Sequence, residues 1–278
     1  MRRLPYALLL FCTFATWPGV GARAKLASSP LQQHNLPLSD PQDQGQWVLN
    51  AGMSDEFSGR SLDPQKWRSH IEGWLGRPPA LFSDKDIELR DGLLQIHMRR
   101  ENVDTRYATL GYTHYTTGAV QSKGTVLYGY VEVRAKAMRS AGASAVWLAA
   151  HTEADVNEID IAEMGGRAPA DPHSVFMSLH AFKAGGIPVK LDNRGLQHTA
   201  FDVSERFHVY GVEWEPAFIN FYLDGVLARR VVNTKWSTPS TIILDAEIQG
   251  DWFGMPADRD LPSTYSVDYV HVWTHAPR

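Results

Sequence analysis

Three acidic residues lie close together in the segment from Asn157 to Met164, which reads Asn-Glu-Ile-Asp-Ile-Ala-Glu-Met. Acidic and apolar residues alternate there, as expected for a strand with one face on a core and the other on solvent or a cleft. In a regular strand Glu158 and Asp160 share a face, whereas Glu163 points the other way. A β-bulge near residues 161–162 would return Glu163 to that face. Without the bulge the carboxyl would be buried unpaired, at a cost of several kcal/mol.

Three carboxyls on one face can perform glycosidase chemistry. Their repulsion keeps one of them protonated at neutral pH, and glycoside hydrolysis needs a carboxylate and a carboxylic acid across the glycosidic bond. With the bulge, the Cα atoms of Glu158 and Glu163 lie roughly 13 Å apart. Side chains that lean inward by about 4 Å bring the carboxyls to ~5 Å, the separation of a retaining mechanism, with Asp160 between them. For the acids taken alone, a solvated acidic strand or a cation site is an equally good interpretation.

The rest of the chain predicts strands that would position this segment. Alternating or β-rich patterns predict strands in eight regions, with an Asp-Gly hairpin signal inside the region 207–232. These regions are 92–98, 128–138, 143–149, 157–163, 175–182, 207–232, 241–249 and 265–273. No stretch sustains a helical period over three turns. Many strands at short spacing predict an all-β fold of two packed antiparallel sheets, a β-sandwich.

Composition sets the class of protein and its compartment. The 278 residues include 27 basic and 31 acidic ones, so a basic nucleic-acid binder is not expected. Residues 1–24 predict a signal peptide, with Arg2 and Arg3 before an apolar run and a small-residue cleavage site before Lys25. That run is shorter than the ~20 residues of a membrane span. We therefore expect a secreted protein, extracellular or periplasmic, with a flexible leader at 25–45 and one catalytic domain at 46–278.

Cofactor motifs are not found in the sequence. It contains one cysteine, and no Cys/His set has the spacing of a zinc site. No glycine loop of the phosphate-binding type occurs either. We therefore expect no cofactor for catalysis and no nucleotide.

The acidic segment also resembles a known family. Glu158-Ile-Asp-Ile-Ala-Glu163 is similar to the E-[ILV]-D-x-x-E signature of glycoside hydrolase family 16 in its β-bulge form. The other similar pieces are Ser54-Asp-Glu-Phe-Ser, Tyr115 to Lys123, Tyr128 to Lys136, Phe207 to Trp214, Phe221-Tyr-Leu-Asp-Gly and Val267-Asp-Tyr-Val. The resemblance runs from Trp47 to Trp273. It implies a curved, concanavalin-like jelly roll whose concave face holds an endo-acting sugar cleft, with Glu158 as nucleophile, Glu163 as acid/base and Asp160 as their helper.

Within this family the details are most similar to the agarases and porphyranases. The loop from Gly73 to Phe82 and the run from Asp245 to Trp252 resemble theirs, whereas the residues at 149–151 and 164–166 depart from the usual pattern. The resemblance implies a retaining endo-hydrolase of a red-algal galactan. A β-1,3- or β-1,3-1,4-glucanase with the same machinery is the alternative enzyme. A carbohydrate-binding lectin on the same fold is the alternative from another class, although it would not need three acids.

Aromatic and polar residues predict the substrate contacts. A sugar's C–H face stacks on indole rings, and its hydroxyls require polar partners at the rim. The predicted substrate-binding residues are Trp74, Arg77, Trp147, His180, Glu247 and Trp252. Strand context instead assigns four other tryptophans to core packing, namely Trp47, Trp67, Trp214 and Trp273. For His180 and Arg77, a structural histidine and a surface arginine are the alternatives.

The resemblance implies one further site and the partners. Many relatives carry a structural calcium on the convex side, and Glu56, the carbonyl of Gly92 and Asp268 occupy the matching places; oxygen ligands suit calcium. The expected partner is a galactan polysaccharide, with or without sulfate. Neither nucleic acid nor a membrane is expected as a partner, and the protein is expected to be a monomer.

Overall fold

The computed structural model describes residues 36–153, 155–168, 173–183, 187–188 and 193–277. The predicted signal peptide, 1–24, and residues 25–35 of the predicted leader lie outside this part. Within it, no helix has both the length and the apolar character needed to cross a membrane.

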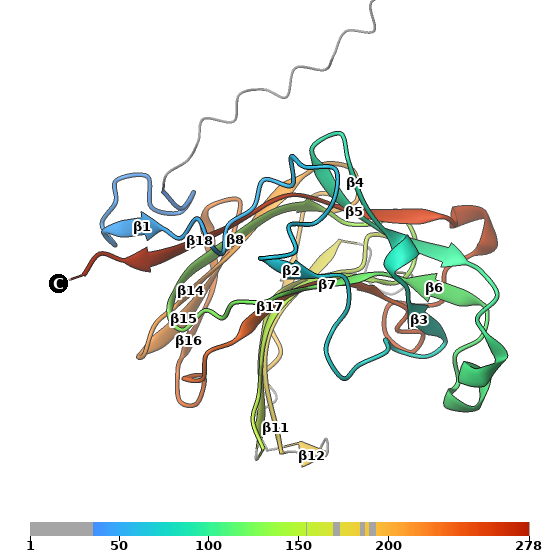
Figure 1. Cartoon of the computed structure of the whole chain (residues 1–278). Coiled ribbons are helices and arrows are strands. Elements are labelled where there is room, and N and C mark those ends of the chain that lie inside the picture. The colour runs from blue at the N-terminus through green and yellow to red at the C-terminus, as the bar shows by residue number, and fades with distance from the viewer. Residues whose placement is uncertain (1–35, 154, 169–172, 184–186, 189–192, 278) are drawn as a thin grey trace, which may run out of the picture. The chain divides into compact units, whose positions relative to one another are not determined.

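The described residues fold into two sheets packed face to face, and this confirms the predicted curved β-sandwich (Figure 1). The ten-stranded sheet has the order β16-β15-β14-β8-β18-β5-β6-β3, with β1 on β18 and β4 on β5. Its strands are β1 (Trp47–Leu49), β3 (Ala80–Phe82), β4 (Ile87–Arg90), β5 (Leu93–Arg100), β6 (Tyr115–Thr117), β8 (Gly129–Lys136), β14 (His208–Trp214), β15 (Phe218–Leu223), β16 (Val226–Val232) and β18 (Ser263–His275).

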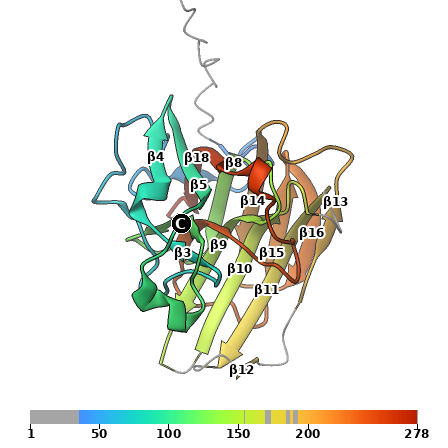
Figure 2. The same cartoon turned by 90° about the vertical axis from the view of Figure 1, so that its right-hand side faces the viewer.

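The eight-stranded sheet carries the acidic segment. Its order is β12-β11-β10-β9-β17-β7-β2, with β13 on β11, so β9 and β11 flank β10 (Figure 2). Its strands are β2 (Trp67–Arg68), β7 (Ala119–Ser122), β9 (Ala143–His151), β10 (Asp155–Met164), β11 (Ser174–Lys183), β12 (Ile187–Pro188), β13 (Leu196–His198) and β17 (Thr241–Glu247). Three short 3-10 helices are η1 (Asp84–Asp86), η2 (Thr105–Leu110) and η3 (Asp258–Asp260).

The core between the sheets follows from alternation. In β8 the side chains of Val131, Val133 and Ala135 face the core, and in β10 those of Ile159 and Ile161 do so. Because successive side chains of a strand point to opposite faces, the acids of β10 lie on the face turned away from this core. All eight regions predicted as strands are strands. The four tryptophans assigned to the core are buried, which confirms that assignment for Trp47, Trp67, Trp214 and Trp273.

The outer face of the ten-stranded sheet is partly covered by the chain before β1. The backbone N–H of Leu38 donates to Glu132 Oε2 at 2.8 Å, and Ser39 Oγ donates to the hydroxyl of Tyr130 at 2.9 Å. Tyr130 and Glu132 are therefore buried on the face that the alternation of β8 alone would leave in solvent. Residues 36–45 of the predicted leader thus form contacts with the sandwich.

Candidate active site

A β-bulge in β10 brings the three acids to one face. The register of β10 against β9 shifts between Asp160 and Ala162, and its register against β11 shifts between Asp160 and Glu163. Ile161 and Ala162 are both fully buried, so the extra residue is absorbed on the core side. This is the bulge that the sequence predicts at residues 161–162. All three acids line one cleft, namely Glu158, Asp160 and Glu163.

Burial and mutual repulsion raise the pKa of both glutamates. Burial, followed by the charges of Asp160 and Glu163, raises the pKa of Glu158 well above its ordinary value of 4.5. Burial, followed by the charges of Asp160 and Glu247, raises the pKa of Glu163 well above 4.5, against the opposing charge of Arg194. Because the two glutamates interact strongly, they titrate as a coupled pair that retains a proton at neutral pH.

His180 contacts the middle acid of the cluster. It lies on β11 directly opposite Glu158, and its Nε2 atom is 3.1 Å from Asp160 Oδ2. One ligand atom from each of Glu158, Asp160 and His180 lies within 4.8 Å of the other two. The structure therefore places His180 at the acids, on the side of β10 opposite to Trp147.

A buried tryptophan that the sequence did not single out holds the backbone beneath this contact. Trp236 donates its indole N–H to the carbonyl of Glu158 at 2.9 Å and to the carbonyl of His180 at 3.2 Å. One ring thus ties β10 to β11 at the residues that carry the chemistry. Its distance in sequence from both residues left no pattern from which to predict it.

The strand β17 adds a second pair of carboxyls on the other side of β9. The indole N–H of Trp147 donates to Asp245 Oδ1 at 3.1 Å. Burial, followed by the charge of Glu247, raises the pKa of the fully buried Asp245 well above its ordinary value of 3.8. Glu247 in turn binds the guanidinium of Arg77, whose side chain remains 48% exposed. Asp245 therefore fixes the plane of the Trp147 ring.

The loop before β3 forms one wall of the cleft. Trp74 packs edge-to-face against Trp147, with ring centroids 6.3 Å apart, and against Phe82 at 5.2 Å. The guanidinium carbon of Arg77 lies 6.0 Å from the Trp74 ring centre. Two predicted aromatic contacts and the predicted arginine thus lie together. The cleft is lined by Trp74, Arg77, Ala145, Trp147, Glu158, Asp160, Glu163, Glu247 and Gln249.

Trp252 lies elsewhere, beyond Glu163. Its ring packs on Phe176 at 4.6 Å between centroids, and Phe176 is the residue of β11 opposite Glu163. The guanidinium of Arg194 lies 5.4 Å from the Trp252 ring centre. Trp252 is not among the residues that line the cleft around the acids. Arg194, whose charge acts on Glu163, had no sequence signal that distinguished it from a surface arginine.

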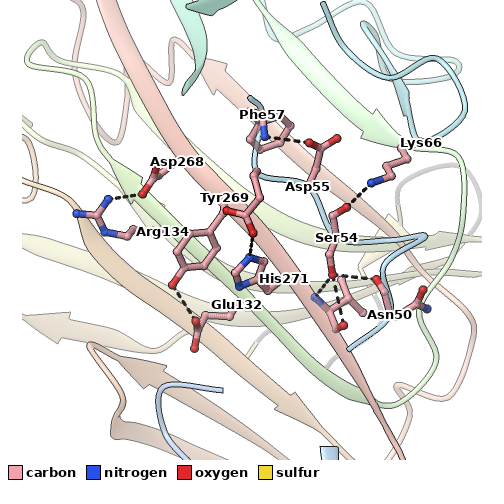
Figure 3. A network of polar contacts seen from close by, with 12 residues as sticks. Asn50, Ser54, Asp55, Phe57, Lys66, Glu132, Arg134, Asp268, Tyr269 and His271 are labelled. Atoms are coloured by element: carbon pink, nitrogen blue, oxygen red, sulfur yellow. Dashed lines mark hydrogen bonds and ion pairs between the residues drawn. The ribbon is translucent and has the colours of Figure 1, made fainter. Parts of the chain in front are cut away.

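The contacts of the residues predicted to bind calcium do not favour that ion. Asp268 binds the guanidinium of Arg134 (Figure 3), and Glu56 Oε1 lies 2.5 Å from His271 Nε2. Gly92 lies in the turn between β4 and β5. Both predicted carboxylates are thus engaged by side-chain donors, and a guanidinium beside Asp268 would repel a divalent cation. The contacts of Glu56 and Asp268 therefore do not fit the predicted calcium site.

The geometry can support acid and nucleophilic catalysis on one bond. A cluster that retains one proton offers a carboxylic acid and a carboxylate on the same strand face. Trp147 and Trp74 offer aromatic faces beside it, where the C–H groups of a sugar can pack. Arg77 and Glu247 offer hydrogen-bonding groups at the rim for hydroxyls. Such a cleft suits a polar ligand with apolar faces.

The chain is similar in sequence to known proteins. Residues 47–275 match the family model described as the GH16 domain of β-porphyranases A–D. The chain is 33% identical over 269 residues to β-porphyranase B of Zobellia galactanivorans, covering 86% of this chain and 89% of that protein. It is 27% identical over 278 residues to glucan endo-1,3-β-glucosidase A1 of Niallia circulans, covering 87% of this chain but only 40% of that protein.

A solved structure shares the fold. The crystal structure of porphyranase B from Zobellia galactanivorans aligns with a TM-score of 0.67 and 27% identity. The alignment covers 82% of this chain and 92% of that one.

Proposed function

The chain belongs to glycoside hydrolase family 16, and on that premise we propose that it is a secreted, retaining endo-hydrolase of a red-algal galactan of the agarose or porphyran type. The observation that carries the proposal is the bulge at residues 161–162, which sets Glu158, Asp160 and Glu163 on one face of the cleft. Secretion rests on the sequence of residues 1–24 alone. The monomeric state also stays a prediction.

The proposed reaction is a double displacement. Glu158 attacks the anomeric carbon as a carboxylate while Glu163 donates its proton to the departing glycosidic oxygen. A glycosyl ester on Glu158 results, and the deprotonated Glu163 then takes a proton from the water that hydrolyses this ester. Repulsion from Asp160 supports a protonated Glu163 before the first step. Asp160 also lies against the Glu158 carboxyl, and this contact positions the nucleophile.

The cleft wall supports a galactan over a glucan. The family model is that of porphyranases, and the loop with Trp74 and Arg77 is the part of the sequence most like agarases and porphyranases. The half-exposed Arg77 can donate to a sugar hydroxyl or to a sulfate through its fork of N–H groups. Glucanase activity is the second candidate, because glucan endo-1,3-β-glucosidase A1 of Niallia circulans aligns with most of this chain.

A substrate panel tests the proposal. The purified protein would be incubated with agarose, porphyran, carrageenan and laminarin, and new reducing ends would be measured over time. We expect release from agarose or porphyran and none from laminarin. Glu158→Gln is the control for contaminating hydrolases, and Glu153→Gln, an exposed acid just before β10, is the control for the loss of a charge. Release from laminarin alone would contradict the galactan assignment, and equal release by Glu158→Gln would contradict the site.

A further inference from the structure

A row of polar side chains crosses four strands on the outer face of the ten-stranded sheet. Tyr130 of β8 is paired with Glu213 of β14, Glu213 with Asn220 of β15, and Asn220 with Arg230 of β16. Directly paired residues point to the same face of a sheet, so the four side chains lie side by side. This row belongs to the other sheet from the one that carries the acids.

The row forms the floor of a pocket of about 400 Å³. The segment from Ser39 to Trp47 forms one wall, and it is held in place because Asp40 accepts hydrogen bonds from the N–H of Gly45 at 2.8 Å and from the indole of Trp47 at 3.0 Å. Phe218 and Tyr222, the residues two before and two after Asn220, stand on the same face and flank the row. The pocket is therefore built from fixed backbone and aromatic side chains.

The hydrogen bonds on the floor leave an acceptor unused. Asn220 Nδ2 donates to Glu213 Oε2 at 2.8 Å, and the hydroxyl of Tyr222 donates to the same oxygen at 2.7 Å. If the side-chain amide of Asn220 were flipped, its oxygen would face the carboxylate of Glu213. This carboxylate therefore fixes the orientation of the amide. Asn220 is only 4% exposed, and no donor among the described residues reaches its Oδ1 atom. A buried acceptor without a donor is rare in native proteins and calls for an explanation.

The chemistry of the pocket selects a neutral, hydroxyl-rich ligand. The carboxylates of Asp40 and Glu213 disfavour an anion, and the guanidinium of Arg230, 4.1 Å from the Phe218 ring centre, disfavours a free cation. Acceptors, a donor and aromatic side chains around one floor match the hydroxyls and C–H faces of a sugar. We propose that this pocket is a second carbohydrate-binding site, which holds an uncharged stretch of polysaccharide outside the catalytic cleft.

A second site would act through effective concentration. The assignment to a polysaccharide rests on the proposed function, because only a polymer or its solid aggregate can occupy the pocket and the cleft at once. Once the pocket is bound, the cleft meets neighbouring sugar units at a raised local concentration, so retention on an insoluble polymer exceeds the affinity of the cleft alone. Short soluble oligosaccharides gain nothing from the pocket.

Retention on an insoluble polymer tests the proposal. In a Glu158→Gln background, Kd would be measured by depletion from suspensions of agarose and of laminarin-coated beads. The double variant Phe218→Ala/Arg230→Ala removes the rim of the pocket, and Glu213→Gln changes one floor acceptor at nearly constant shape. Leu227→Ala, an exposed residue of the same strand β16, is the matched control. Thermal melting reports whether each variant is folded.

We expect both pocket variants to bind the polymer on the order of tenfold more weakly than the parent, with Leu227→Ala unchanged. With Glu158 restored, their kcat/KM on soluble tetrasaccharides should match that of the wild type. Equal retention of the pocket variants and the parent, an equal loss in Leu227→Ala, or no retention of the parent on either polymer would overturn the second site. Retention that depends on the pocket in a protein that hydrolyses nothing would instead overturn the proposed function and leave the second site standing.

Discussion

The Nε2 atom of His180 lies 3.1 Å from Oδ2 of Asp160, so the strand next to β10 contacts the middle carboxyl of the acidic cluster. Asp160 lies between its two glutamates in sequence and is nearly fully buried. Because His180 approaches from β11 and Trp236 ties the backbones of β10 and β11 together, the position of Asp160 is fixed from outside its own strand. The carboxyls of Glu158 and Glu163 therefore flank a fixed third charge.

Glu158→Gln should abolish turnover while leaving the fold and substrate binding largely intact. An amide of the same size cannot form the glycosyl ester, so turnover is lost. The amide occupies the same buried position without an ionisable group whose pKa burial raises, so the fold is kept. Initial rates and a Kd for an oligosaccharide would be measured on the same preparation. Activity close to that of the wild type would remove Glu158 from the mechanism.

Asp160→Asn should be damaging but less complete. The amide keeps a contact with His180, yet it loses the charge that raises the pKa of both glutamates. Since positioned proton transfer contributes on the order of 10²–10⁴-fold, we expect kcat to fall by roughly 10²-fold. The pH profile should change with it, because Glu158 and Glu163 are coupled and both respond to the charge of Asp160. A variant that loses rate with an unaltered pH profile would speak against this role for Asp160.

Trp74→Ala should lower kcat/KM on the galactan by roughly 1–3 kcal/mol in transition-state terms, as expected for the loss of a stacked ring. Trp74 lines the cleft and contacts Trp147. The neighbouring Leu75→Ala, which removes an exposed side chain, serves as the control. If Trp74→Ala lowered only the melting temperature, with unchanged kinetics per folded molecule, Trp74 would be a packing residue.

Asp245→Asn should flatten the pH dependence of stability. Burial raises the pKa of Asp245 well above 3.8, so the folded state keeps a proton that the unfolded chain releases above about pH 4. The folded state then binds more protons, and the free energy of unfolding falls as the pH rises. Asparagine keeps an acceptor for the Trp147 indole and has no proton to lose.

Urea unfolding at several values between about pH 5 and pH 8 would measure this effect. The free energy of unfolding of the wild type should fall as the pH rises across this range, because burial raises the pKa of its buried carboxyls. The free energy of unfolding of Asp245→Asn should fall less. Asp251→Asn changes an exposed acid close to Asp245 in the sequence. It is the control and should follow the wild type. Equal slopes for Asp245→Asn and the wild type would contradict the buried proton.

The sequence predicts local structure well where the residues of a single strand determine that structure. The bulge in β10 follows from two rules alone, that acids avoid the core and that strands alternate. Trp147 could be placed beside the acids because its predicted strand is next to theirs, and Trp74 because its loop resembles that of agarases and porphyranases. Both line the cleft, and their contact with a substrate stays a prediction. The short strands β1, β2 and β3 could not, since two or three residues carry no period.

Contacts between distant segments are the part that the sequence did not give. Trp236 contacts Glu158, which lies 78 residues away in the sequence, and Asp245 contacts Trp147, which lies 98 residues away. No local spacing pattern in the sequence indicates either contact. The outer face of β8 is polar by alternation, yet Tyr130 and Glu132 are buried because the chain before β1 covers them. The calcium prediction matched residue types, but Arg134 and His271 engage the two carboxylates.

The stereochemistry of the first product tests the central claim most directly. Proton NMR of a fresh digest of the galactan would follow the anomeric signals of the new reducing ends before mutarotation. If the bulge sets the carboxyls of Glu158 and Glu163 about 5 Å apart, the β-anomer should appear first and the α-anomer only later. Initial formation of the α-anomer would mean that water attacks directly from between more widely separated carboxyls, and it would contradict the double-displacement mechanism.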